Sequence, residues 1–127
     1  MNLEKIIFGF FIILACTLNF GFFIGDITRI ELHHPVELFA ALIVNLVATV
    51  LKFGDRTHLG ATHLATSLAA VLQLVAASFY WAWHLYIQQL PIDAGASAVI
   101  VSLSGGALVA NIISVILLMG ETLRQSR

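Results

Sequence analysis

The chain has 127 residues, of which 60% are hydrophobic and only 10% are charged, and its mean hydropathy is +0.99. A soluble domain of this size cannot bury so much apolar surface, so the composition excludes a soluble protein and indicates one whose solvent is the lipid bilayer. The formal net charge of −1 gives no reason to expect a nucleic-acid partner.

Four stretches of the chain are long and apolar enough to cross a membrane. A spanning helix needs roughly 20 mostly apolar residues, and such stretches lie at about residues 6–24, 36–53, 61–86 and 96–119. Nothing remains for a separate soluble domain. We therefore predict one all-α transmembrane domain of four helices over residues 1–127.

The first stretch is rich in phenylalanine and contains the lone cysteine, Cys16. Large rings spread around a helix commonly face lipid, so we predict a peripheral helix. A single cysteine excludes an internal disulfide. Apolar sequence continues beyond Cys16, which favours a plain helix with a buried thiol over a lipidation site.

The basic residues are distributed unevenly over the two faces of the predicted helix bundle. With four spans, only Arg29 falls on one face, and the positive-inside rule then puts both termini in the cytoplasm of a multi-pass protein in the bacterial inner membrane. The outer face carries the acids Asp26, Glu31, Glu37 and Asp93. The basic residues on the cytoplasmic face are Lys5, Lys52, Arg56, Arg124 and Arg127.

Histidines gather at the ends of the predicted spans. On the outer side, His33, His34, Glu37 and His84 are candidates for a transition-metal site, and two facing histidines are candidates for haem. The competing interpretation is that these histidines lie at the interface and bind nothing, and we predict no resident cofactor. On the inner side, His58 and His63 are five residues apart and do not share a helix face, but either can act as a pH sensor.

The second and fourth helices contain similar segments. Residues 41–55 read ALIVNLVATVLKFGD and residues 107–121 read ALVANIISVILLMGE, so Asn45 corresponds to Asn111. Both helices run in the same direction, which favours a tandem repeat of two helical hairpins. Residues 41–54 also resemble the second helix of small four-helix fluoride channels, which carries a mid-membrane asparagine. The resemblance covers one helix, and that family's arginine and its third helix have no counterpart here.

Polar side chains in the middle of the spans are the main candidates for function. Asn45, Gln73 and Asn111 are predicted at similar depth, with Thr49 and Ser114 nearby. One interpretation is a set of interhelical hydrogen bonds that clamp the packing. The other is a water-filled path in which amide oxygens replace part of an ion's hydration shell.

Small residues recur at every fourth position of the last two helices. This spacing allows close approach of two helices in lipid, either within one chain or at a seam between subunits of a homo-oligomer. The helix 4 stripe is Ala98, Ser102, Gly106, Ala110 and Ser114, and the helix 3 stripe is Ala61, Ala65, Ala69, Gln73 and Ala77.

Motifs of phosphate-binding loops, hydrolases and metalloproteases are missing, so the chain is predicted not to be an enzyme. An acidic outer face concentrates cations. We therefore predict an oligomeric cation channel or channel-like subunit. The alternatives are a non-conducting accessory subunit of a larger membrane complex and, third, a metal- or haem-binding membrane protein.

Overall fold

The computed structural model describes residues 3–55 and 57–125, with the side chain of Gln125 left out. Arg56 and Arg127, which entered the topology prediction, lie outside the described residues. Every regular element in the described part is helical. The elements are α1 (Leu3–Phe23), the 3-10 helix η1 (Ile30–Leu32), α2 (Pro35–Lys52), α3 (His58–Ala82), the π-helical segment η2 (Trp83–Ile87) and α4 (Ala94–Gln125).

The predicted all-α architecture is confirmed, because four helices are long and apolar enough to cross a membrane. Local sequence explains where they begin. Pro35 opens α2, a position where its missing N–H costs nothing. Thr57 caps α3, its hydroxyl oxygen accepting a hydrogen bond from the Gly60 amide. At the start of α4, the Asp93 carboxylate accepts one from the Ala96 amide.

The end of the fourth helix differs from the prediction. The helix α4 continues past residue 119, where the apolar stretch ends, to Gln125. Hydropathy marks the end of the apolar stretch and not the end of the helix, and the glutamate, leucine and arginine that follow are good helix formers. Lys5 pairs with Glu121 at 2.6 Å and ties this extension to α1. The third span ends at Ile87, close to the predicted residue 86, but its last turn is the π-helical segment η2, and hydropathy does not distinguish a π-helix from an α-helix.

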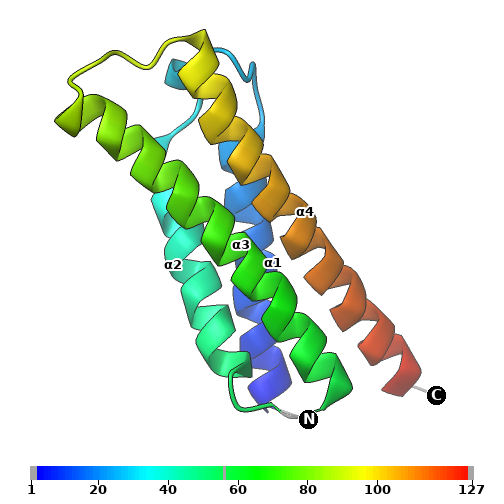
Figure 1. The fold of residues 1–127 in the computed structure, drawn as a ribbon. Coiled ribbons are helices and arrows are strands. Elements are labelled where there is room, and N and C mark those ends of the chain that lie inside the picture. The colour runs from blue at the N-terminus through cyan, green and yellow to red at the C-terminus, as the bar shows by residue number, and fades with distance from the viewer. Residues whose placement is uncertain (1–2, 56, 126–127) are drawn as a thin grey trace.

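The four long helices form an antiparallel bundle in which α1 packs against α2 and α4, and α3 packs against the same two helices (Figure 1). The start of α1, the end of α4 and the loop between α2 and α3 lie at one end, which we call the terminal end. The loops that contain η1 and follow η2 lie at the opposite end. The helices α2 and α4 run in the same direction on opposite sides of the bundle.

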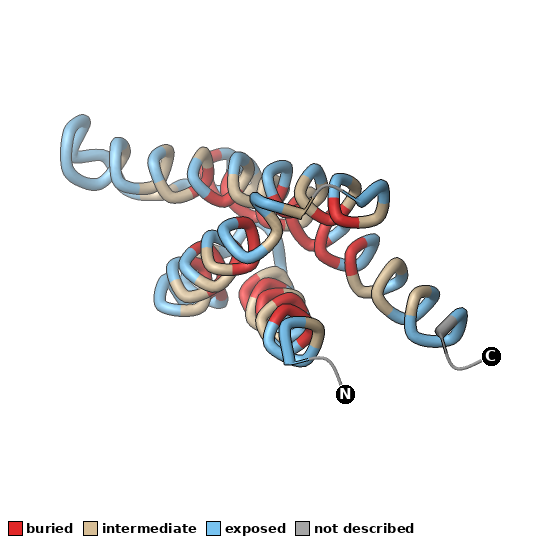
Figure 2. Tube along the Cα trace, turned by 90° about the horizontal axis from the view of Figure 1, so that it is seen from below, coloured by how far each residue is buried: buried red, intermediate tan, exposed pale blue. Residues whose placement is uncertain are grey.

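Buried residues gather where the helices meet (Figure 2). The helix α1 is not peripheral as predicted: Phe8, Ile12 and Phe22 are at most 2% exposed, because its phenylalanines point inward as well as outward. The helix with the smallest buried share is α3. Near the opposite end the core is apolar, and its largest buried members are Phe22, Leu38, Leu74, Ile100 and Val101.

Candidate functional site

The interior of the bundle contains polar side chains from all four long helices. Each long helix contributes at least one of them, and in the described part of the chain they are at most 6% exposed. A polar group withdrawn from water is costly unless it finds a partner, so the partners of each decide what the interior can do. The buried polar side chains of the helices are Asn19, Asn45, Thr49, His63, Ser67, Ser97, Ser104, Asn111 and Ser114.

Asn19 joins α1 to α4. With its amide oriented so that both polar atoms find partners, it donates to the Ser104 carbonyl at 2.9 Å and accepts from the Leu108 amide at 3.1 Å and from Asn111 Nδ2 at 3.2 Å. In an α-helix that amide and that carbonyl would normally bond to each other. Asn19 therefore reaches into the backbone of α4 at mid-span. We did not single out Asn19 from the sequence, although an asparagine inside an apolar span is the same signal that selected Asn45.

The glycines beside Ser104 make this close contact possible. A Cβ atom on Gly105 would lie 2.7 Å from Cε1 of the Phe23 ring, and the position of a Cβ atom on Gly106 is occupied by the Gln73 side chain. Side chains from α1 and α3 thus rest directly on the backbone of α4. The sequence SGGA at residues 104–107 is a packing site between three helices.

Asn45 and Asn111 are both buried, at 0% and 1% exposure, but they do not bond to each other. Asn45 Nδ2 donates to the Ala41 carbonyl of its own helix at 2.9 Å, and the Thr49 hydroxyl donates to the Asn45 carbonyl at 2.8 Å. The predicted interhelical clamp is therefore formed by Asn111 with Asn19 and not by Asn45. The amide oxygens of Asn45 and Asn111 and the Ser67 hydroxyl have no hydrogen-bond partner in the described structure.

Gln73 lies apart from the two asparagines. It is half-buried over Gly106, and its amide oxygen has no partner. Gly106 precedes Asn111 by five residues, so Gln73 sits roughly 7 Å further toward the opposite end. The prediction that Gln73 stands beside Asn45 and Asn111 is wrong, because equal depth in a hydropathy plot ignores how far each helix is shifted along the bundle.

The predicted stripes of small residues do not form single faces. An α-helix turns about 100° per residue, so a four-residue repeat drifts by about 40° at each step. Along α4 the residues pass from exposed Ser102 and half-buried Ala98 and Gly106 to buried Ala110 and Ser114. Along α3, in the same way, Ala61, Ala65 and Ala69 are exposed, Gln73 is half-buried and Ala77 is buried.

The predicted metal ligands are not brought together. Among the described residues no three histidine, cysteine or acidic side chains form a group that could hold a metal ion. His33 is buried, with Nδ1 2.6 Å from the Phe22 carbonyl and Nε2 2.7 Å from the Asp26 carbonyl, so its ring nitrogens hold the loop that follows α1. His34 is exposed, and His84 lies against the Tyr80 ring. The position of a Cβ atom on Gly21 is occupied by the Glu37 carboxylate.

His63 is the centre of a second polar group, close to the terminal end. Its Nδ1 lies 3.1 Å from the Ser114 hydroxyl of α4, which lies 2.7 Å from the Thr66 hydroxyl. The Phe8 ring meets the imidazole edge-on, and Lys52 Nζ lies 4.3 Å from the centre of the Phe8 ring. His63 also lines a pocket of about 360 Å³ together with charged residues from the helix ends. From the sequence we expected Ser114 in the polar group but did not connect it with His63.

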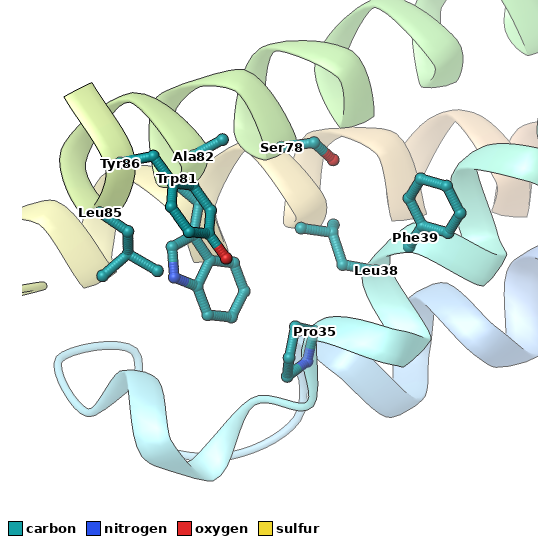
Figure 3. Close-up of a pocket in the computed structure, with 8 residues that line it drawn as sticks. All are labelled: Pro35, Leu38, Phe39, Ser78, Trp81, Ala82, Leu85 and Tyr86. Atoms are coloured by element: carbon teal, nitrogen blue, oxygen red, sulfur yellow. The ribbon is translucent and has the colours of Figure 1, made fainter.

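At the opposite end, an apolar crevice of about 370 Å³ separates the start of α2 from the end of α3 (Figure 3). Pro35, Leu38 and Phe39 line one side, and Trp81 and its neighbours line the other. The lining is mostly apolar, and the hydroxyls of Ser78 and Tyr86 are among its few polar groups.

Comparison with known proteins gives one match. A family model described as a family of unknown function, DUF6394, matches residues 32–122. No curated protein and no solved structure matches the chain.

Proposed function

We propose that this protein forms an oligomeric cation channel or channel-like subunit in the bacterial inner membrane. The chain belongs to DUF6394, a family of unknown function. The path runs through the polar interior, and the oxygens of Asn45, Asn111 and Ser67 bind the cation.

One observation carries this proposal: among the buried side-chain oxygens without a hydrogen-bond partner in the described structure are those of Asn45, Ser67 and Asn111, three residues that are at most 1% exposed. In hydrocarbon an unsatisfied polar group costs several kcal/mol. Amide and hydroxyl oxygens are the groups that replace water around a hard monovalent cation. A cation with part of its water shell satisfies them, whereas a dry interior leaves each one uncompensated.

The apolar core near the opposite end supplies the gate. Phe22, Leu74, Ile100 and Val101 are all fully buried and form an apolar cluster at that level. A hydrophobic constriction stops conduction by excluding water. In this proposal the described structure is the closed state, with its wet half toward the terminal end.

Charge at the opposite end favours a cation as the passenger. Asp26, Glu31 and Asp93 are exposed there, with Arg29 the one basic side chain of lysine or arginine type in that part of the described chain. The Thr28 amide, followed by its hydroxyl, donates to Asp26 and lowers the pKa of that carboxyl below its ordinary value. Asp26 is therefore anionic at neutral pH and attracts cations to this mouth.

The orientation follows from the positive-inside rule. Lys5, Lys52 and Arg124 lie at the terminal end, which we therefore assign to the cytoplasm together with both termini. The common direction of α2 and α4, and the burial of Asn45 and Asn111, support a tandem repeat of two hairpins.

We assign the subunit contact to the exposed alanine face of α3, made of Ala61, Ala65 and Ala69. Small side chains permit close helix approach in lipid. In a Cys16→Ala background, Ala65→Cys should give disulfide-linked dimers in membranes. Val50→Cys, which is also exposed but lies on α2, is the matched control and should not give such dimers. Equal cross-linking of both would contradict this contact.

Flux measurement tests the function itself. Purified protein in liposomes should pass monovalent cations, and Asn45→Ala with Asn111→Ala should abolish the flux while the protein stays folded. Ser102→Ala, which changes an exposed polar residue of α4, is the control and should conduct normally. Absence of flux from well-folded wild-type protein would refute a stand-alone channel and favour the accessory-subunit alternative.

A further inference from the structure

The hydrogen bonds around His63 determine which of its ring nitrogens carries the proton. A hydroxyl group has one hydrogen to donate. The Thr66 hydroxyl donates its hydrogen to the His63 backbone carbonyl at 2.9 Å. The bond between Thr66 and Ser114 must then be donated by Ser114, which leaves Ser114 to accept from His63 Nδ1–H. In the neutral imidazole, Nε2 is therefore the bare nitrogen.

This bare nitrogen has no partner within the protein. His63 is only 1% exposed, and its Nε2 atom is buried without a hydrogen-bond partner in the described structure. The same residue lines the pocket of about 360 Å³ at the terminal end. Protonation of Nε2 would leave the bond from Nδ1 to Ser114 unchanged, so the site can gain or lose a proton without rearranging the network.

Charged residues from every neighbouring element surround the pocket. The two lysines are each paired with an acid: Lys5 with Glu121 at 2.6 Å, and Lys52 with Asp55 at 3.6 Å. A proton on His63 therefore adds a positive charge to a mouth whose lysines are already neutralised. The charged residues of the lining are Glu4 and Lys5 from α1, Lys52 from α2, Asp55 from the loop and Glu121 from α4.

We propose that Nε2 of His63 is a proton-binding site open to the terminal end, and that a proton bound there inhibits cation passage. The inhibition rests on the proposed function, because it requires that cations pass His63 on the way to Asn111. The proton-binding site itself does not depend on the proposed function. The ligand is a proton delivered through the pocket, and its positive charge reduces the attraction of the acidic lining for cations, lowering their local concentration by about tenfold.

Nitrogen NMR of the protein in lipid nanodiscs tests the site without any flux. The His63 signals are assigned from His63→Gln. We expect a neutral form with hydrogen on Nδ1 and a bare Nε2, and conversion to the doubly protonated ring as the pH is lowered. Ser114→Ala should abolish the preference for that tautomer, and Ser97→Ala, a buried serine elsewhere on α4, should keep it. A neutral ring with hydrogen on Nε2, or a ring that does not titrate, would overturn the site.

Flux at two pH values tests the inhibition. Acid on the side of the terminal end should reduce cation flux in the wild type about tenfold, and His63→Gln should retain its flux. Equal inhibition of both proteins would overturn the regulation while leaving the channel intact. Titration of His63 in a protein without flux would support the proton site and refute the channel.

Discussion

A methyl group added at Gly105 should separate α1 from α4. The Cβ atom of Gly105→Ala would lie 2.7 Å from Cε1 and 3.2 Å from Cδ1 of Phe23. Carbon atoms in good contact stand about 3.5 to 4.0 Å apart. The ring must therefore retreat by up to about 1 Å. Asn19, one turn before Phe23 on the same helix, then loses its bonds to Ser104 and Leu108.

The expected loss of stability combines three contributions. Overpacking of this kind costs about 1 to 3 kcal/mol. Each interhelical hydrogen bond lost in a membrane adds about 0.6 kcal/mol. Alanine in place of glycine returns up to about 1 kcal/mol through helix propensity. The net destabilisation is about 1 to 3 kcal/mol.

Gly120→Ala is the matched control on the same helix. A Cβ atom there meets nothing within 4 Å, so this variant should be as stable as the wild type or slightly more stable. Reversible unfolding in mixed micelles with increasing SDS measures both free energies of unfolding. If Gly105→Ala is as stable as Gly120→Ala, the close contact of α1 with α4 at Phe23 is wrong.

Three further predictions concern the loops. Thr57→Ala should cost about 1 kcal/mol because it removes the cap of α3, and Thr57→Ser should cost much less; thermal unfolding compares them. The Thr57 hydroxyl, followed by its amide, lowers the pKa of Asp55 below 3.8. Because the pKa of Asp55 is lower in the folded state than in the unfolded state, this stabilisation is present above about 3.8 and is lost as the pH falls through the lowered pKa. Weaker protection of the Thr57 amide against exchange in acid, relative to its intrinsic rate, would show the loss, and Asp55→Asn would remove the pH dependence. His33→Leu should remove the polar contacts of the ring with the Phe22 carbonyl of α1 and the Asp26 carbonyl of the loop, and should expose residues 25–34 to protease. An unchanged cleavage rate would contradict the role of His33.

Hydropathy alone predicted the number and approximate extent of the spanning helices, because the bilayer demands long apolar helices whatever their partners. It also singled out Asn45 and Asn111, since an amide in an apolar span is conspicuous. The rotation of each helix about its own axis was harder to predict. A four-residue repeat suggests one helix face, but the drift of about 40° at each step carries Ser102 outward and Ser114 inward.

Partners supplied by tertiary structure were beyond the sequence pattern. The carbonyls that hold His33 come from α1 and the loop after it, and a backbone acceptor leaves no trace in composition. His63 and Ser114 are 51 residues apart and meet only because α3 packs against α4. The depth of Gln73 depended in the same way on how far α3 is shifted relative to α4.

Water accessibility of the interior tests the central claim most directly. In a Cys16→Ala background, single cysteines at Ser67 and Leu74 place one thiol in the polar half of α3 and one in the apolar core, both fully buried. A charged thiol reagent added on the side of the terminal end should modify Ser67→Cys and leave Leu74→Cys unmodified. If Ser67→Cys is as inert as Leu74→Cys in folded protein, the interior is dry and the asparagines serve packing alone.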